Sequence, residues 1–143
     1  MLSDISKNTV AVCVTGQMGC DRLISAGREL ADRLDAPLVV MSALPRLYDA
    51  QTAQVLEYLY SCSTQAGAQM LVMYTAHPMD ALIDGFKKQN VGHVLLGAPR
   101  DRSSQMGARL MSAYPGVKYY ALDPQGKACL GGRGVAVSPW LLA

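Results

Sequence analysis

The sequence is poor in charge. Only 17% of its 143 residues are charged and the formal net charge is +2, while half of the residues are apolar. The lysines and arginines are spread along the chain and are not interleaved with aromatic side chains, so the sequence excludes a nucleic-acid partner. Because the apolar fraction is high for a solvated monomer, we expect a second copy to cover part of the surface, most simply in a homodimer.

Long hydrophobic runs and a leader pattern are also missing. The longest apolar runs, such as "PLVVM" and "HVLLGA", are far shorter than the ~20 residues that cross a bilayer, so we expect no membrane span. The first residues, "MLSDISKN", show no basic region followed by an apolar one, and a secretory signal needs both. The expected compartment is therefore the cytoplasm.

Clustered metal ligands are absent too. The four cysteines, Cys13, Cys20, Cys62 and Cys129, form no C-x-x-C pair, and the chain has only two histidines. This spacing does not suit a zinc site, and we expect no metal. In a reducing compartment, free and partly buried thiols are the simplest interpretation.

What the sequence does contain is an alternation of two kinds of segment. Five short apolar stretches, several of them rich in β-branched residues, predict buried strands. They are 9–15 ("TVAVCVT"), 37–44 ("PLVVMSAL"), 69–75 ("QMLVMYT"), 93–98 ("HVLLGA") and 117–122 ("VKYYAL"). Four stretches with apolar residues at helical spacing predict amphipathic helices between them. These run from Leu23 to Leu34, over 49–66, over 78–89 with Pro78 in the first turn, and over 103–114.

The same spacing predicts which side chains of the helices face the core. The predicted inward residues are Leu23, Ile24, Ala26, Gly27, Leu30, Ala31 and Leu34 in the first helix, Ala53, Leu56, Leu59, Tyr60 and Ser63 in the second, Leu82, Ile83 and Phe86 in the third, and Met106, Leu110 and Met111 in the fourth.

The alternation predicts an α/β fold. Strands joined through helices run parallel, and right-handed crossovers build a three-layer α/β/α sandwich. We predict a five-stranded parallel sheet of order 3-2-1-4-5 within a domain of residues 1–123. Such a sheet binds ligands where the strand order reverses, at the carboxyl ends of strands one and four. The loops expected there, "TGQMG" at 15–19 and "GAPRDRSSQMG" at 97–107, are rich in glycine and polar residues.

Residues 124–143 differ in character. "PQGKACLGGRG" is flexible by composition, and "VAVSPWLLA" is an apolar tail that would be costly to leave in water. Two positions for this tail remain open. It docks on its own domain, or it forms a strand or arm that contacts a protein partner such as a neighbouring subunit.

Two stretches resemble universal stress protein domains, especially the version within KdpD-type potassium sensor kinases. "RLISAGRELADRLDAPLVVMSAL" is similar to the first helix and second strand of that family, and "ALIDGFKKQNVGHVLLGAPR" to its third helix and fourth strand. The resemblance spans Thr9 to Leu122. It implies an adenine nucleotide α-hydrolase-like sandwich, a dimer, a regulatory and non-enzymatic role in stress signalling, and binding of ATP or another adenine nucleotide.

The loop after the fourth strand departs from the ATP-binding pattern of that family, which is G-x-x-G, about nine residues, and then G-S or G-T. Gly97 fits the first glycine, but Arg100 stands in the place of the second, and Gly107 is followed by Ala108. An acidic residue is often found after the first strand in the family, and Thr15 and Gly16 stand there instead. Arg100 weakens a tight triphosphate cradle, because backbone amides wrap a phosphate only where no side chain intervenes.

The candidate ligand-binding residues come from both loops and from the second strand. Glycines ahead of the first helix leave its amino end open to an anion, and arginines beside serines supply hydrogen-bond donors. The candidates are Thr15, Gly16, Gly19, Ala43, Gly97, Arg100, Arg102, Ser103 and Ser104. Two interpretations stay open for them: a nucleotide or anion site, and a solvated loop whose glycines only permit tight turns. The sequence has neither a Walker motif nor G-x-G-x-x-G.

A cysteine-based enzyme is the alternative. Cys13, followed by "VTG", resembles the phosphocysteine loop of the enzyme IIB proteins of sugar phosphotransferase systems, and Cys20 stands at the start of the first helix, where a thiolate is favoured. The sequence supplies neither cysteine with an adjacent base. His77 and His93 are expected on opposite rims of the sheet, so they do not form a catalytic pair. We therefore expect no catalytic residues.

Overall fold

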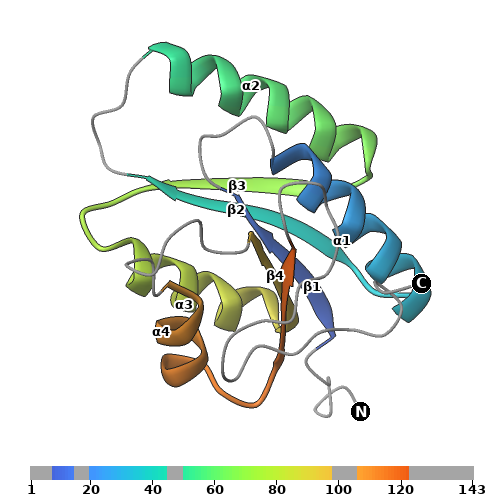
Figure 1. Ribbon diagram of the computed structural model, residues 1–143, viewed down its shortest axis with the longest axis vertical. Coiled ribbons are helices and arrows are strands. Elements are labelled where there is room, and N and C mark those ends of the chain that lie inside the picture. The colour runs from blue at the N-terminus through green and yellow to red at the C-terminus, as the bar shows by residue number, and fades with distance from the viewer. Residues whose placement is uncertain (1–7, 15–19, 45–49, 98–105, 123–143) are drawn as a thin grey trace.

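The computed structural model describes residues 8–14, 20–44, 50–97 and 106–122. Strands and helices alternate along the chain (Figure 1). The strands are β1 (Thr9–Cys13), β2 (Leu38–Leu44), β3 (Gln69–Tyr74), β4 (Val91–Gly97) and β5 (Lys118–Leu122), and the helices are α1 (Cys20–Leu34), α2 (Ala50–Gln65), α3 (Pro78–Gln89) and α4 (Met106–Ala113). The strands form one sheet of order β3-β2-β1-β4-β5 in which every pair is parallel, which confirms the predicted topology.

The first strand lies at the centre of this sheet. β1 pairs with β2 on one side, where Val12 is opposite Val40, and with β4 on the other, where Val12 is opposite Leu95. All five residues of β1 are buried. A strand with helices over both faces needs apolar side chains on both faces, which is why "TVAVC" shows no polar alternation.

The helix ends follow local sequence signals. Pro78 stands in the first turn of α3, where its missing N–H costs no helical hydrogen bond. Asn90 ends the helix in the left-handed conformation, with φ of 59°, and its N–H donates to the carbonyl oxygens of Lys87 and Phe86. Asp35, at φ of 53°, follows α1 in the same conformation. β4 begins at Val91, two residues before the predicted start.

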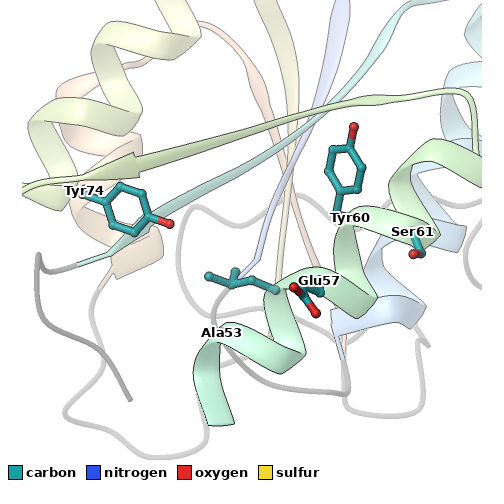
Figure 2. Close-up of a pocket in the computed structure, with 6 residues that line it drawn as sticks. Ala53, Glu57, Tyr60, Ser61 and Tyr74 are labelled. Atoms are coloured by element: carbon teal, nitrogen blue, oxygen red, sulfur yellow. The ribbon is translucent and has the colours of Figure 1, made fainter. Parts of the chain in front are cut away.

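Two predicted core residues are exposed instead. The buried residues of α2 are Val55, Leu56, Leu59 and Ser63, so the inward face is rotated toward Val55 and leaves Tyr60 60% exposed (Figure 2). Leu34 is 38% exposed because it is the last residue of α1, at the point where the chain leaves the helix. The other predicted inward residues that the structure describes with their side chains are buried or half-buried.

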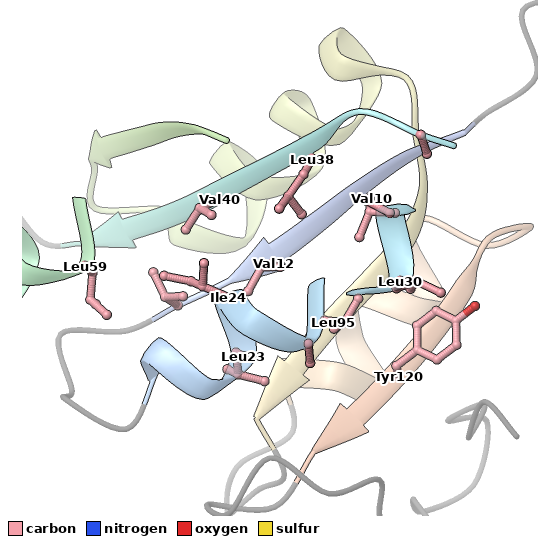
Figure 3. Close-up of a cluster of buried hydrophobic side chains, with 14 of the residues drawn as sticks. Val10, Val12, Leu23, Ile24, Leu30, Leu38, Val40, Leu59, Leu95 and Tyr120 are labelled. Atoms are coloured by element: carbon pink, nitrogen blue, oxygen red, sulfur yellow. The ribbon is translucent and has the colours of Figure 1, made fainter. Parts of the chain in front are cut away.

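The sheet separates two apolar cores. Alternate strand residues such as Val10, Val12 and Val40 pack beneath α1 and α2 (Figure 3). The residues between them, such as Ala11 and Met41, pack against α3 and α4 on the opposite face. These are the three layers that the sequence predicts. No helix in the described ranges has the length and apolar character needed to cross a bilayer. The predicted domain boundary at 123 lies outside the described residues.

Candidate functional site

The strand order reverses between β1 and β4. From this point the chain passes from β1 to α1 on one face of the sheet and from β4 to α4 on the other (Figure 1). The N–H of Val14, just after β1, donates to the carbonyl oxygen of Met41 at 2.9 Å, which holds this end of β1 against β2. The connections that follow Val14 and Gly97 therefore leave the same rim from neighbouring strands. In parallel α/β sheets this arrangement forms the ligand crevice.

Two of the predicted ligand-binding residues lie in the described part of the chain. Gly97 is the exposed last residue of β4. Among the described residues, a Cβ atom built on it would meet only Leu23 Cδ1, at 3.8 Å, an ordinary van der Waals contact. Ala43 lies near the carboxyl end of β2 and packs, partly buried, on the α3–α4 side. The remaining predicted residues, Thr15, Gly16, Gly19, Arg100, Arg102, Ser103 and Ser104, lie outside the described residues.

Sequence reasoning missed a polar residue beside Ala43. Ser42 is completely buried in β2, and among the described residues its Oγ has no hydrogen-bond partner. Buried hydroxyls almost always have one, so this group is an exception within the core. The signal that could have found it is a single serine within the apolar stretch "PLVVMSAL".

Cys13 is poorly suited to nucleophilic chemistry. Its side chain is 8% exposed and belongs to the apolar cluster on the α3–α4 side. Burial disfavours the thiolate and raises the pKa of this thiol to about 12. Because the thiolate is the nucleophile, these surroundings count against phosphoryl transfer through Cys13. Cys20 is the first residue of α1, and its side chain is not among those that the structure describes.

The two histidines lie far apart in the fold, as predicted. His77 precedes α3 after the carboxyl end of β3, and its backbone N–H donates to Thr75 Oγ1 at 2.9 Å. His93 lies in the amino half of β4, with its Nδ1 3.0 Å from Tyr120 Oη. Burial, and then the nearby Lys118 charge, lower the pKa of His93. Within the described ranges no three His, Cys, Asp or Glu side chains are grouped as a metal site would require.

The sequence matches no protein-family model, and no curated protein is significantly similar to it. Solved structures do match. UspA from Lactobacillus plantarum superposes with a TM-score of 0.65 at 12% identity, over 82% of this chain and 99% of that one. The universal stress protein of Archaeoglobus fulgidus in complex with dAMP gives 0.59 at 17% identity, over 80% and 96%. A universal stress protein in complex with cAMP gives 0.62 at 16% identity, over 82% and 97%.

The chain has the universal stress protein fold. The superpositions span nearly the whole length of each neighbour, so the common part is the complete sandwich and not a single βα unit. They agree with the order of strands and helices given above. At these identities the likeness shows the fold, and the site must be argued from this chain's own residues.

Proposed function

We propose that this chain is a non-enzymatic regulatory module of universal stress protein type, and that it binds a nucleotide or another anion between the connections after β1 and β4. The observation that carries the proposal is the adjacency of β1 and β4 where the strand order reverses. Two solved proteins of the same fold are complexes with dAMP and cAMP. The ligand class that this supports is an adenine nucleotide.

The proposed contacts combine backbone and side-chain groups. Gly16 and Gly19 precede α1, and a helix of this length attracts an anion to its amino end. Arg100 and Arg102, beside Ser103 and Ser104, supply donors to a phosphate group. Since Arg100 replaces a loop glycine, we propose that a mononucleotide fits this site better than ATP.

The proposal also includes self-association and a cytoplasmic signalling role, similar to the sensor module of KdpD-type kinases. Half of the residues are apolar, and only 17% are charged. Light scattering of the purified chain over a range of concentrations tests the dimer, because its mass should reach twice the chain mass of 15.3 kDa. A monomeric mass at every concentration would contradict this part of the proposal and would leave the ligand site untouched.

Thermal melting in the presence of AMP, cAMP or ATP tests the ligand site. A ligand at about 100 times its Kd stabilises the native state by about 2.7 kcal/mol. For a chain of this size that amounts to a rise in Tm of several degrees. We expect AMP and cAMP to raise Tm more than ATP does. No shift with any nucleotide would contradict the proposal.

Two variants and a control test whether the rise in Tm comes from ligand bound between the connections after β1 and β4. Gly97→Val adds a side chain that meets only Leu23 among the described residues, so it should abolish the shift and leave Tm without ligand nearly unchanged. Arg100→Ala with Arg102→Ala should weaken binding of AMP more than binding of adenosine, because only AMP carries a phosphate. Ala113→Val, at the exposed carboxyl end of α4, is the matched control and should bind like the wild type.

A further inference from the structure

An open groove lies between α2 and the carboxyl end of β3. Figure 2 shows Ala53, Glu57, Tyr60 and Ser61 on α2 and Tyr74 at the end of β3, and Leu56 completes the lining. Its volume is about 520 Å³. Tyr60 and Tyr74 are 60% and 49% exposed, and they are two of the four large hydrophobic side chains that are exposed among the described residues. We call this surface the α2–β3 groove.

The strand beside this groove lacks the usual protection of a sheet edge. Within the described ranges β3 pairs only with β2, so its outer side is an open edge. Natural proteins protect such edges with charge, proline or bulges. β3 has no charged residue and no proline, its pairing with β2 runs without a register shift, and Met70, Leu71, Val72 and Met73 are partly buried, less completely than the residues of β1. A groove with two exposed tyrosine rings beside an unprotected edge is a surface that a partner segment would cover.

The chain carries a segment of matching chemistry outside the described residues. Residues 135–142 read "VAVSPWLL" and include the only tryptophan of the sequence. Tryptophan buries a large area, and its ring packs well against tyrosine rings. Among the described lining residues Glu57 carries the only charge, and the stretch that precedes the segment contains Lys127 and Arg133.

The length of the intervening chain suits docking within one molecule. The described part ends at Leu122, the last residue of β5, and in a parallel sheet this is the same rim as the carboxyl end of β3. Four strand spacings separate β5 from β3, which is about 19 Å. Residues 123–134 form a glycine-rich stretch, and a chain of that composition and length has an r.m.s. end-to-end distance of about 19 Å. Effective concentration is greatest where the two lengths agree.

We propose that residues 135–142 dock into the α2–β3 groove of their own chain, with Trp140 as the anchoring side chain. A partner segment tethered at millimolar effective concentration outcompetes the same segment on another molecule at micromolar concentration. The docked segment shields Tyr60, Tyr74 and the apolar edge of β3 from water. This surface is separate from the rim between β1 and β4, so the inference does not depend on the proposed function.

Because Trp140 is the only tryptophan, its fluorescence reports on this contact in the full chain. In the wild type we expect blue-shifted emission and slow quenching by acrylamide. Tyr60→Lys places a charge in the groove and should red-shift the emission and raise the quenching constant several-fold. Tyr58→Lys is the matched control, since Tyr58 is an exposed tyrosine of the same helix that bonds to Asp21 outside the groove. Tyr58→Lys should leave the emission maximum and the quenching constant of Trp140 at their wild-type values.

Two results would overturn the proposal. One is emission from Trp140 in the wild type that matches the urea-unfolded chain. The other is equal quenching in wild-type and Tyr60→Lys protein, both shown to be folded by circular dichroism. If Tyr60→Lys does not fold, Ser61→Lys makes the same test from an exposed position on the groove.

Mixing two full-length variants separates docking within a chain from docking between chains. Trp140→Phe has an intact groove and no tryptophan, and Tyr60→Lys has a tryptophan and a damaged groove. If the segment docks within its own chain, adding Trp140→Phe leaves the quenching of Tyr60→Lys unchanged. If quenching slows on mixing, the segment occupies the groove of a second copy, and the proposal is wrong.

Discussion

The two edge strands of the sheet are covered to very different degrees. On β5, Lys118 is exposed, and Tyr119, Tyr120 and Ala121 are at most 5% exposed. On β3, Gln69 and Tyr74 are exposed, and the four residues between them are half-buried. Both strands are short, parallel and paired on one side within the described ranges, so strand geometry does not explain the difference.

The buried tyrosines of β5 have polar partners on neighbouring elements. Tyr119 Oη lies 2.7 Å from the carbonyl oxygen of Tyr114 and 3.0 Å from that of Leu110, both in or next to α4. Tyr120 Oη lies 3.0 Å from His93 Nδ1 on β4. A tyrosine can be buried when its hydroxyl finds such a partner. In β3, four apolar residues, Met70 to Met73, are partly buried and have no comparable polar group to bond.

The largest expected contrast is in stability. Tyr120→Ala should lower the free energy of unfolding by about 4 kcal/mol, because it empties the space of a nearly buried ring. Tyr74→Ala should cost only about 1 kcal/mol, because half of that side chain is already in water. Urea denaturation followed by circular dichroism measures both values. Equal losses would mean that the two edges are covered alike.

A smaller contrast concerns the hydroxyl groups. Tyr119→Phe removes the donor shared by two buried carbonyl oxygens, and we expect a loss of about 1–2 kcal/mol. Tyr58→Phe also removes a hydrogen bond, to Asp21, but this bond is exposed, and the change should stay within about 0.5 kcal/mol. The same denaturation assay applies. A neutral Tyr119→Phe would show that hydrogen bonding does not hold the β5 edge.

The β5 side should also show a pH dependence. The pKa of His93 is lowered in the folded state from the ordinary value of 6.5, so the unfolded chain binds a proton at higher pH than the native protein does. Stability therefore falls as the pH drops below about 6.5 and levels off below the native pKa. His93→Gln keeps a polar partner near Tyr120 and should reduce this slope. An unchanged slope in Tm against pH would exclude His93 as its source.

The smallest effect on the free energy of unfolding is expected at Ser42 in β2, the strand that pairs with β3. Ser42 has a buried hydroxyl with no partner in the described ranges, so Ser42→Ala should leave stability within about 0.5 kcal/mol of the wild type or raise it. This is the opposite of Tyr119→Phe, where the buried hydroxyl is bonded. A loss above about 1 kcal/mol would show that Ser42 holds a hydrogen bond in solution.

Short-range patterns predicted most of the fold. Five apolar stretches and four amphipathic ones predicted a parallel sheet between two helix layers, because strands joined through right-handed helical crossovers run parallel, and the predicted strand order was confirmed. Pro78 and the Asn90 turn marked the ends of α3 for local conformational reasons. The rim between β1 and β4 followed from the same topology.

Other features could not be predicted from local spacing. Tyr60 lies at the margin of the apolar face of α2, and the neighbouring strands decide whether such a residue is covered. The sequence does not show whether Ser42 faces water or the core, because its burial depends on groups from other elements. The raised pKa of Cys13 also arises from side chains distant in sequence that surround its thiol.

The sequence by itself determined the succession of strands and helices, their parallel pairing and the rim at which β1 and β4 end, because these depend on periodicity and chain connectivity. Only the tertiary structure decided that Tyr119, Tyr120 and Ala121 of β5 are buried while Met70 to Met73 of β3 are partly buried, and that one buried hydroxyl in β2 has no partner among the described residues. The physical reason is that burial and hydrogen bonding depend on atoms brought together from distant parts of the chain, and residue spacing within one element does not contain that information.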